Sequence, residues 1–456
     1  MTILWLVALP LVVALLVILF QRLPLVSVPL AAGTLVAVAI LAATLGDTGS
    51  LIILGRSIGL SSREGFSLAI ISGLLAVMML YTYAVPQGQL SHSLSLAAVA
   101  FFAASMIVRN MTIATLFLQM GGIVSVMLIP SQSERSAITA TRALIAIGLS
   151  GMLLLLSAWA MESRTTTFDT VVLSYIGGIT LIIGFGIALA VGPFYVWLPP
   201  VFRYSSSLAA VVVSVALSST LLVHLGNILT ATLWPGGHEF LSVMLVAAGV
   251  ATVLIGGLST LFQRTISRIL AYATLADLGI ILIGLGLNTR DSLGASYLHM
   301  AYRGMAVVLV AMADGMLKAL PGGDDVDSLR GALRRAPLAT AALLVGGLSL
   351  AGLPPFAGFG TRFSIYRVLA TEHPAWVLVV LACSIGPAWS FIRCFVETLR
   401  PERSPAEGRR ENLFPALLTL PLTLGLGLLG LAPQLLTLLP VPWFDLVTRG
   451  PLLLGH

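Results

Sequence analysis

Long apolar runs separated by short polar connections fill the chain from its first residues to about residue 433. Most runs are about 20 residues long, which is the length that a helix needs to cross the ~30 Å hydrocarbon core of a bilayer. Transmembrane β-strands would instead be shorter segments of alternating polarity. The pattern therefore predicts an all-α polytopic membrane protein. About fourteen spans are expected, near residues 3–20, 25–45, 66–84, 93–108, 111–130, 142–160, 171–192, 208–230, 240–262, 269–287, 295–318, 338–357, 375–395 and 413–433.

Composition agrees with this pattern and excludes other classes. The chain has 456 residues, of which 58% are apolar and 9% charged, and its mean hydropathy is +1.03. A soluble domain carries about 25% charged residues, so a soluble enzyme or a disordered chain is excluded. The longest polar stretches, near 319–336 and 397–412, are expected to be solvated loops.

The net charge of +6 predicts an orientation and gives no indication of nucleic-acid binding, because the basic residues are scattered between apolar runs. When the loops are assigned alternately to the two sides, fourteen basic residues fall opposite the termini and six fall on the terminal side. Basic loops face the cytoplasm. Both termini are therefore predicted to lie outside it.

Two of the runs are interrupted by proline, at Pro193 and at the pair Pro354 and Pro355. Proline removes a backbone donor and breaks a helix. Broken backbone within a membrane is tolerated where it is buried in protein or lines a watery cavity, and paired broken helices in two halves of a chain point to an ion or substrate pathway. The alternative is that proline and glycine are simply more frequent in membrane helices than in soluble ones.

Ionisable residues well inside the predicted spans are few, and the candidates are His224, Asp277, His299, Arg303 and Asp314. Such residues usually face a partner or a cavity. We predict that Asp277 and Arg303, at similar depth on consecutive spans, pair directly or through water. In the alternative, Arg303 binds backbone carbonyls and Asp277 binds hydroxyls such as that of Thr274. No nucleotide, haem, iron–sulfur or metal-ligand motif stands out, so no cofactor is expected.

Three segments carry a resemblance to a known family: the stretch from Pro193 to Pro199, residues 268–274 (RILAYAT) and residues 350–359 (LAGLPPFAGF). The chain resembles the antiporter-like membrane subunits of proton-pumping NADH–quinone oxidoreductase (complex I), Mrp antiporters and energy-converting hydrogenases. The resemblance implies fourteen helices, external termini and two inverted five-helix repeats, each with a broken helix. It divides the chain into helices 1–3 (3–84), a first repeat (93–230), a second repeat (240–395) and a final helix (413–433).

The chain departs from this family at the positions that carry its proton relay. Gln119 stands where the resemblance implies a glutamate, and Arg362 where it implies a lysine after the proline pair. Further expected lysines align with Ala188, His224 and Val307, and an expected histidine aligns with Arg303. Glutamine, alanine and valine do not titrate, and arginine keeps its proton at every relevant pH. The proton relay is therefore expected to be largely degenerate.

From these residues we expect a membrane-arm subunit of a redox-driven pump of the NADH–quinone oxidoreductase type, in a bacterial-type inner membrane. It would bind neighbouring membrane subunits and lipid but no nucleic acid, would not be catalytic alone, and would meet NADH and quinone only through partner subunits. The ion-pathway candidates are Gln119, His224, Asp277, His299, Arg303, Asp314 and Arg362. The alternatives are an Mrp-type cation/proton antiporter subunit, or a non-conducting coupling subunit of a hydrogenase or inorganic-carbon uptake complex.

Overall fold

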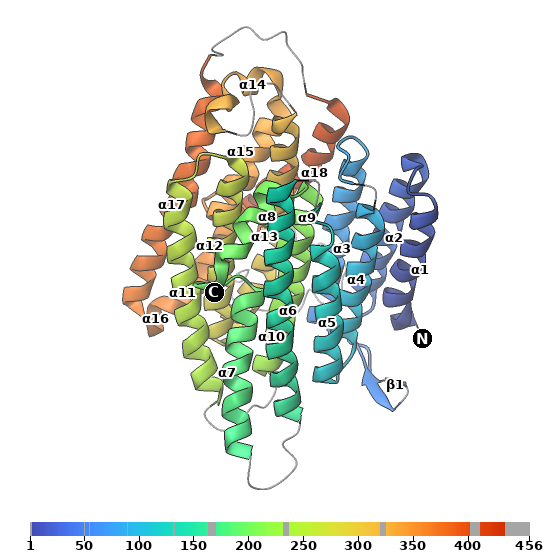
Figure 1. Cartoon of the computed structure of the whole chain (residues 1–456). Helices are drawn as coiled ribbons and strands as arrows, with labels where there is room; N and C mark the ends of the chain where they lie inside the picture. The colour runs from blue at the N-terminus through green and yellow to red at the C-terminus, as the bar shows by residue number, and fades with distance from the viewer. Residues whose placement is uncertain are drawn as a thin grey trace. The chain divides into compact units, whose positions relative to one another are not determined.

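A computed structural model gives the fold, and most of its described residues are helical (Figure 1). It describes residues 2–49, 51–53, 55–88, 90–130, 133–162, 170–230, 237–319, 325–401 and 411–433. The chain divides into two compact units. The first contains residues 1–76 and 88–246, and the second contains residues 77–87 and 247–440.

The helices of the first unit begin with a short 3-10 turn, η1 (Thr2–Leu4). They continue as α1 (Trp5–Leu19), α2 (Pro24–Thr44), most of α3 (Ser62–Thr82), α4 (Ser91–Ile107), α5 (Met111–Val126), α6 (Glu134–Glu162), α7 (Thr170–Ala188), η2 (Phe194–Trp197), α8 (Leu198–Tyr204), α9 (Ser207–Val211), η3 (Val212–Leu217), α10 (Ser218–Thr230) and the start of α11 (Gly237–Leu261). Of these, α4, α5 and α6 pack in sequence, and α7 packs on α6.

The second unit contains the rest of α11 and the helices that follow it. These are α12 (Ile266–Gly286), α13 (Arg290–Lys318), η4 (Val326–Leu329), α14 (Ala332–Arg335), α15 (Pro337–Ala351), α16 (Gly358–Glu372), α17 (Pro374–Leu399) and α18 (Leu413–Leu431). Helix α13 packs against α12, α15, α16 and α18, so it lies at the centre of this unit.

The prediction of a polytopic helical membrane protein is confirmed. Within the described residues, ten helices are long and apolar enough to cross a membrane, and four shorter apolar helices of 10–17 residues accompany them. Both proline interruptions separate two helices: α7 ends before Pro193, and α15 ends before Pro354.

Three local features differ from the sequence prediction. A two-stranded antiparallel sheet, β1 (Leu51–Ile53) and β2 (Arg56–Ile58), joins α2 to α3 and projects beyond the end of α5 (Figure 1). The polar stretch 319–336 contains the short helices η4 and α14 in its described part. The eighth predicted span is not a uniform α-helix, because η3 within it is a π-helix between α9 and α10.

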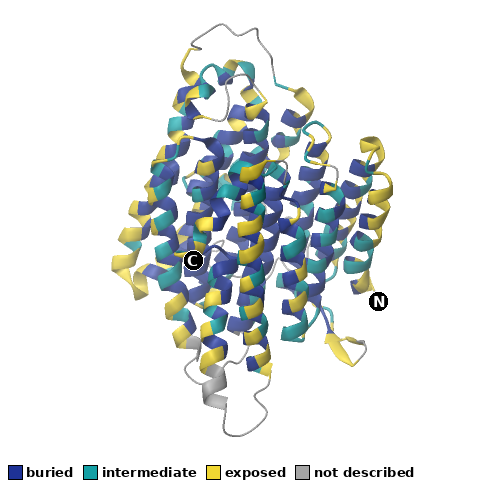
Figure 2. Ribbon diagram, in the orientation of Figure 1, coloured by how far each residue is buried: buried dark blue, intermediate teal, exposed yellow. Residues whose placement is uncertain are grey.

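The helices differ in how far they are buried, from almost entirely buried to largely exposed (Figure 2). The most apolar windows of α12 and α13 are 94% and 89% buried, and that of the α9–α10 segment is 94% buried. The corresponding windows of α1, α17 and α18 are only 28–39% buried, and their exposed side chains include Leu15, Leu19, Ile385 and Leu431. Apolar outer faces suit contact with lipid. The ionisable residues predicted inside spans lie on the buried helices.

Candidate functional site

The second helix break is built by a glycine and two prolines. Gly352 follows α15 with a φ of +74°, a left-handed conformation that glycine adopts without steric penalty. The amide of Leu353 donates to the carbonyl of Leu348 at 3.0 Å, which is the longer hydrogen bond of a Schellman ending. Pro354 and Pro355 follow, and neither can donate a hydrogen bond that would continue the helix.

Arg362 of α16 fills this break. Its Nη1 donates to the carbonyl of Ala351 at 2.7 Å, and its Nη2 donates to the carbonyl of Leu350. The last turn of a helix leaves such carbonyls without intrahelical partners. The same guanidinium reaches Asp277 of α12, with Nε 3.2 Å from Oδ1 and Nη2 in contact with the same oxygen. Arg362 is 3% exposed, so a buried cation joins the broken end of α15 to α12.

Asp277 collects two further partners from α13. The Nε2 atom of His299 lies 2.9 Å from Asp277 Oδ1, and Nε of Arg303 lies 3.9 Å from Oδ2. The other ring nitrogen of His299 lies 2.7 Å from the hydroxyl of Thr361, which is on α16. We call Asp277, His299, Arg303 and Arg362 the ionic cluster. Its four side chains are at most 3% exposed, and they come from three helices.

The predicted contact between Asp277 and Arg303 is therefore confirmed, but only as a long ion pair. The carboxylate has a closer charged partner in Arg362, which the sequence did not suggest. The alternative in which Asp277 binds Thr274 is wrong, since the Thr274 hydroxyl makes no hydrogen bond within the described residues. Backbone carbonyls at the second helix break bind Arg362.

The charges of the ionic cluster do not cancel. Two guanidiniums that keep their protons face one carboxylate, so the cluster carries one net positive charge when His299 is neutral. Histidine is the one side-chain type in the cluster that commonly exists in both charge states near neutral pH. The arrangement can hold three helices together, and it offers one site at which a proton could be gained or lost.

Asp314 is separated from the ionic cluster. It lies fifteen residues after His299 on α13, which is about 22 Å along the helix axis. Its Oδ2 pairs with Lys318 Nζ at 2.7 Å and accepts a hydrogen bond from Ser267 Oγ at 3.0 Å. Lys318 is the only lysine of the chain. The structure thus places this acid and this base together, one helical turn apart near the end of α13.

In the first unit, His224 and Gln119 lie near each other on α10 and α5. The Nε2 atom of His224 is 3.1 Å from the hydroxyl of Thr115, and Gln119 follows Thr115 by one helical turn. Gln119 is 7% exposed and packs against Gly151 of α6, where an added Cβ would lie 2.6 Å from its Oε1. Gln119 therefore occupies space that is open because residue 151 has no side chain.

The first helix break is capped by a neutral donor. After α7 ends, the indole Nε1 of Trp197 donates to the carbonyl of Ile187 at 2.9 Å. Pro193 stands between these two residues, immediately before η2. The two breaks, both expected from proline, thus differ in chemistry. An uncharged indole donates to a carbonyl at the first break, and a buried guanidinium donates to carbonyls at the second.

The sequence missed a buried acid in the first unit, Glu64, because the third span was expected to begin two residues later. Glu64 is 1% exposed and accepts hydrogen bonds from Arg109 Nη1 at 3.1 Å and Asn227 Nδ2 at 2.7 Å. It also accepts from the amide of Ser61 at 2.7 Å, while Ser61 Oγ accepts from the Glu64 amide at 3.4 Å. This reciprocal pair is a capping box, and the spacing Ser-x-x-Glu in the sequence could have revealed it.

Comparison with known proteins identifies the family. A family model described as "NADH:quinone oxidoreductase/Mrp antiporter, TM" matches residues 108–386, which is more than half of the chain. The chain belongs to this family. The match covers both helix breaks, the ionic cluster and the His224 site.

Individual relatives in this family match over part of their length. The chain is 33% identical over 220 residues to "NADH-quinone oxidoreductase subunit N" of Desulfovibrio desulfuricans, covering 46% of this chain and 43% of that one. It is 30% identical over 247 residues to "Formate hydrogenlyase subunit 3" of Escherichia coli, covering 49% and 40%. In such alignments the chain spans about half the length of the curated relatives it matches.

Solved structures share the fold over nearly the whole chain. The membrane-bound sulfane sulfur reductase, an archaeal respiratory membrane complex, contains a chain with a TM-score of 0.84 and 19% identity, covering 98% of this chain and 96% of that one. A chain of the Mrp complex from Dietzia sp. gives a TM-score of 0.83 and 19% identity, with 98% and 97% covered. At this identity the likeness concerns the fold alone.

The family positions at which a lysine was expected lie inside the fold. Val307 is 0% exposed on α13 and Ala188 is 4% exposed at the end of α7. Both side chains are apolar and buried, so neither can carry a proton.

Proposed function

We propose that the chain is a membrane-arm subunit of a redox-driven ion pump of the NADH–quinone oxidoreductase type, with its own proton relay largely degenerate. Family membership supports the first part. The observation that carries the second is the ionic cluster, where Arg362 stands at the position of an expected lysine. A buried lysine can shift its pKa and exchange a proton, whereas arginine remains charged.

The hydrogen bonds of Arg362 support a fixed role for it. The guanidinium is shared among Leu350, Ala351 and Asp277, so moving it would leave two carbonyls and a carboxylate buried without this donor. Unpaired buried groups of this kind are strongly unfavourable. In this proposal Arg362 holds α12, α15 and α16 together, and His299 and Arg303 join α13 to the same carboxylate.

The other candidates are remnants of the pathway in this proposal. His224 and Gln119 mark it in the first unit, and Asp314 marks the end of α13 in the second. Arg303 balances Asp277 rather than moving a proton. The chain would be catalytically inactive alone and would carry no cofactor, with NADH and quinone reacting at partner subunits in a bacterial inner membrane.

A hydrogenase-linked complex is the second candidate for the parent assembly. The 30% identity to Formate hydrogenlyase subunit 3 favours it. A tagged copy of the chain purified from native membranes under mild detergent tests both. Retention of NADH-driven quinone reduction supports the leading proposal, and retention of a hydrogenase supports the second. Recovery of the chain as a single polypeptide with neither activity contradicts both.

We propose further that the chain has fourteen transmembrane helices, in two inverted five-helix repeats at about 93–230 and 240–395, with both termini outside. The fourteen-to-six bias of basic residues supports this orientation. We expect a Leu454→Cys variant, whose position lies outside the described residues, to react with an impermeant maleimide applied to intact cells. Cys383 and Cys394 are buried and give a low background. Labelling only after permeabilisation would reverse the orientation.

Proton flux tests the degenerate relay. The chain reconstituted alone in vesicles with an imposed pH gradient is expected to conduct protons no more than about twofold faster than protein-free vesicles. The reason is that Gln119, Ala188 and Val307 cannot ionise and Arg362 cannot release its proton. Rapid flux that persists in the His224→Ala and His299→Gln variants would contradict the proposal.

A further inference from the structure

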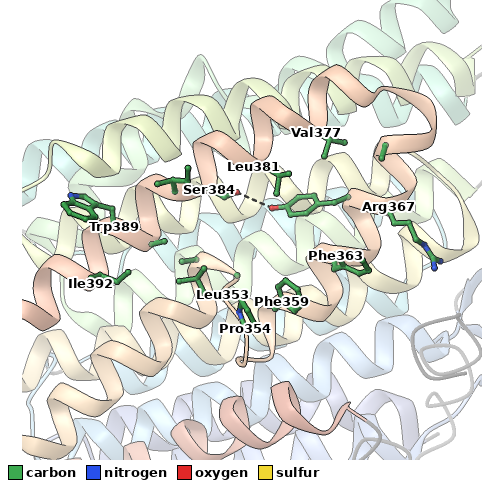
Figure 3. A pocket seen from close by; sticks show the side chains of 16 residues that line it. Leu353, Pro354, Phe359, Phe363, Arg367, Val377, Leu381, Ser384, Trp389 and Ile392 are labelled. Atoms are coloured by element: carbon green, nitrogen blue, oxygen red, sulfur yellow. Dashed lines mark hydrogen bonds between the residues drawn. The ribbon is translucent and has the colours of Figure 1, made fainter. Parts of the chain in front are cut away.

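A deep apolar groove runs between α16 and α17 in the second unit (Figure 3). Its volume is about 800 Å³, and Leu353 and Pro354 of the helix break line it. Phe359 and Phe363 of α16 stack with ring centroids 6.0 Å apart and line one wall. The remaining lining comes mostly from apolar side chains of α17.

The polar groups in the groove already bind one another. The hydroxyls of Tyr366 and Ser384 lie 3.3 Å apart, the contact dashed in Figure 3, and Ser384 Oγ also donates to the carbonyl of Val380 at 2.8 Å. No polar partner is needed to satisfy them. A ligand here gains by burying apolar surface, so an alkyl chain suits the groove better than a polar head.

The groove is elongated along α17. Its lining residues on this helix run from Val377 to Ile392, which is about 22 Å along the helix axis. This length exceeds half of the ~30 Å hydrocarbon thickness of a bilayer, so the groove is long enough for an acyl chain that enters from one leaflet.

One end of the groove carries a cation. Arg367 lines the groove near the turn that joins α16 to α17, and its side chain is 55% exposed. Its contact with Asp291 is long, with Nη2 3.5 Å from Oδ2, and the Asp291 side chain is 34% exposed. Exposed pairs of this kind contribute little, and Arg290 adds a second exposed basic group beside Asp291. Arginine binds phosphate through two parallel hydrogen bonds.

We propose that this groove binds one acyl chain of an anionic phospholipid, with the lipid phosphate at Arg367. The apolar walls hold the chain from Val377 to Ile392, and the guanidinium selects the negative headgroup. Basic residues at the membrane interface bind anionic lipids in this way. The groove borders the ionic cluster at Gly352, but the lipid proposal does not depend on whether the proton relay is degenerate.

Trp389 lines the groove, is 57% exposed, and provides a fluorescent reporter of occupancy. The full chain is reconstituted in phosphatidylcholine vesicles with increasing fractions of lipid brominated near the middle of its acyl chains. The Trp389 signal is the difference between wild type and the Trp389→Phe variant. We expect brominated phosphatidylglycerol to quench half of it at a mole fraction at least fivefold below that needed for brominated phosphatidylcholine.

Two variants distinguish binding of the acyl chain from binding of the lipid headgroup. Arg367→Gln is expected to remove the preference for phosphatidylglycerol, and Ala370→Phe, which fills the groove, is expected to weaken quenching by both lipids. The matched control Arg142→Gln, an exposed arginine on α6, is expected to keep the wild-type preference. Equal quenching by the two lipids in wild type would overturn the proposal. So would absence of quenching in the intact parent complex, because a partner subunit would then cover the groove.

Discussion

The Asp277→Asn variant is expected to lose about 3–5 kcal/mol of unfolding free energy, the range for removing one partner of a buried ion pair. Asparagine keeps the shape of the side chain but removes the charge that faces Arg362 and Arg303, both at most 3% exposed. Two guanidiniums would then remain buried without a carboxylate. Denaturant titration of the purified chain in detergent micelles, followed by tryptophan fluorescence, measures the loss.

Double variants identify which arginine depends on Asp277. In an Arg362→Gln background, Asp277→Asn is expected to have a much smaller effect, since the closest cation is already gone. In an Arg303→Gln background the effect of Asp277→Asn is expected to be reduced less, because the ion pair between Asp277 and Arg303 is 3.9 Å long. Asp291→Asn, which removes the partner of Arg367 near the surface, serves as a control and should change stability by at most about 1 kcal/mol. Purely additive effects in both double variants would exclude coupling within the cluster.

The Gly352→Ala variant is expected to destabilise the protein by at least ~2 kcal/mol. Alanine at a φ of +74° carries a penalty of about 1–2 kcal/mol. Its Cβ would also lie 2.3 Å from Cδ of Arg362, so the arginine would have to move and would lose its hold on Leu350, Ala351 and Asp277. The same titration measures this effect.

Gly360→Ala provides the matched control for this prediction. Gly360 lies on α16, two residues before Arg362, and an added Cβ there would meet nothing within 4 Å. Alanine is favoured over glycine inside a helix by about 0.5–1 kcal/mol, so this variant should be neutral or slightly more stable. If both variants lose the same stability, the effect does not come from Arg362 and the helix break.

Much of the fold could be predicted because its determinants are local. Each apolar run specifies a helix by its own length and hydropathy. The prolines at 193 and 354–355 mark the two helix breaks, whereas four others lie inside continuous helices: Pro10, Pro29, Pro387 and Pro421. The hairpin of β1 and β2 could not be predicted in this way, since backbone hydrogen bonds to residues elsewhere in the chain stabilise it. The Arg109 amide donates to Ser57, and the Gly59 amide donates to Ile107 at the end of α4.

Partners of the buried charges were predicted less well. The pairing of Asp277 with Arg303 followed from the assumption that consecutive helices are adjacent, and α12 and α13 are indeed in contact. The closer partner, Arg362, lies 85 residues away from Asp277 in the sequence and on a helix that packs on both. No pattern of spacing within one helix reveals such a contact. Glu64 was missed for a different reason, because a polar residue at the edge of an apolar run was assigned to the loop.

The sequence by itself therefore determined that this protein is a polytopic membrane protein of the antiporter-like family, with two broken helices and few ionisable residues inside its spans. Hydropathy, proline position and residue identity act within a single segment and can be recognised without coordinates. The tertiary structure alone decided which buried groups meet: Arg362 with Asp277 and the carbonyls of α15, Glu64 with Arg109 and Asn227, and Asp314 with Ser267. These contacts depend on the rotation and packing of helices that are distant in the chain, and a buried charge takes whichever partner that packing brings within reach.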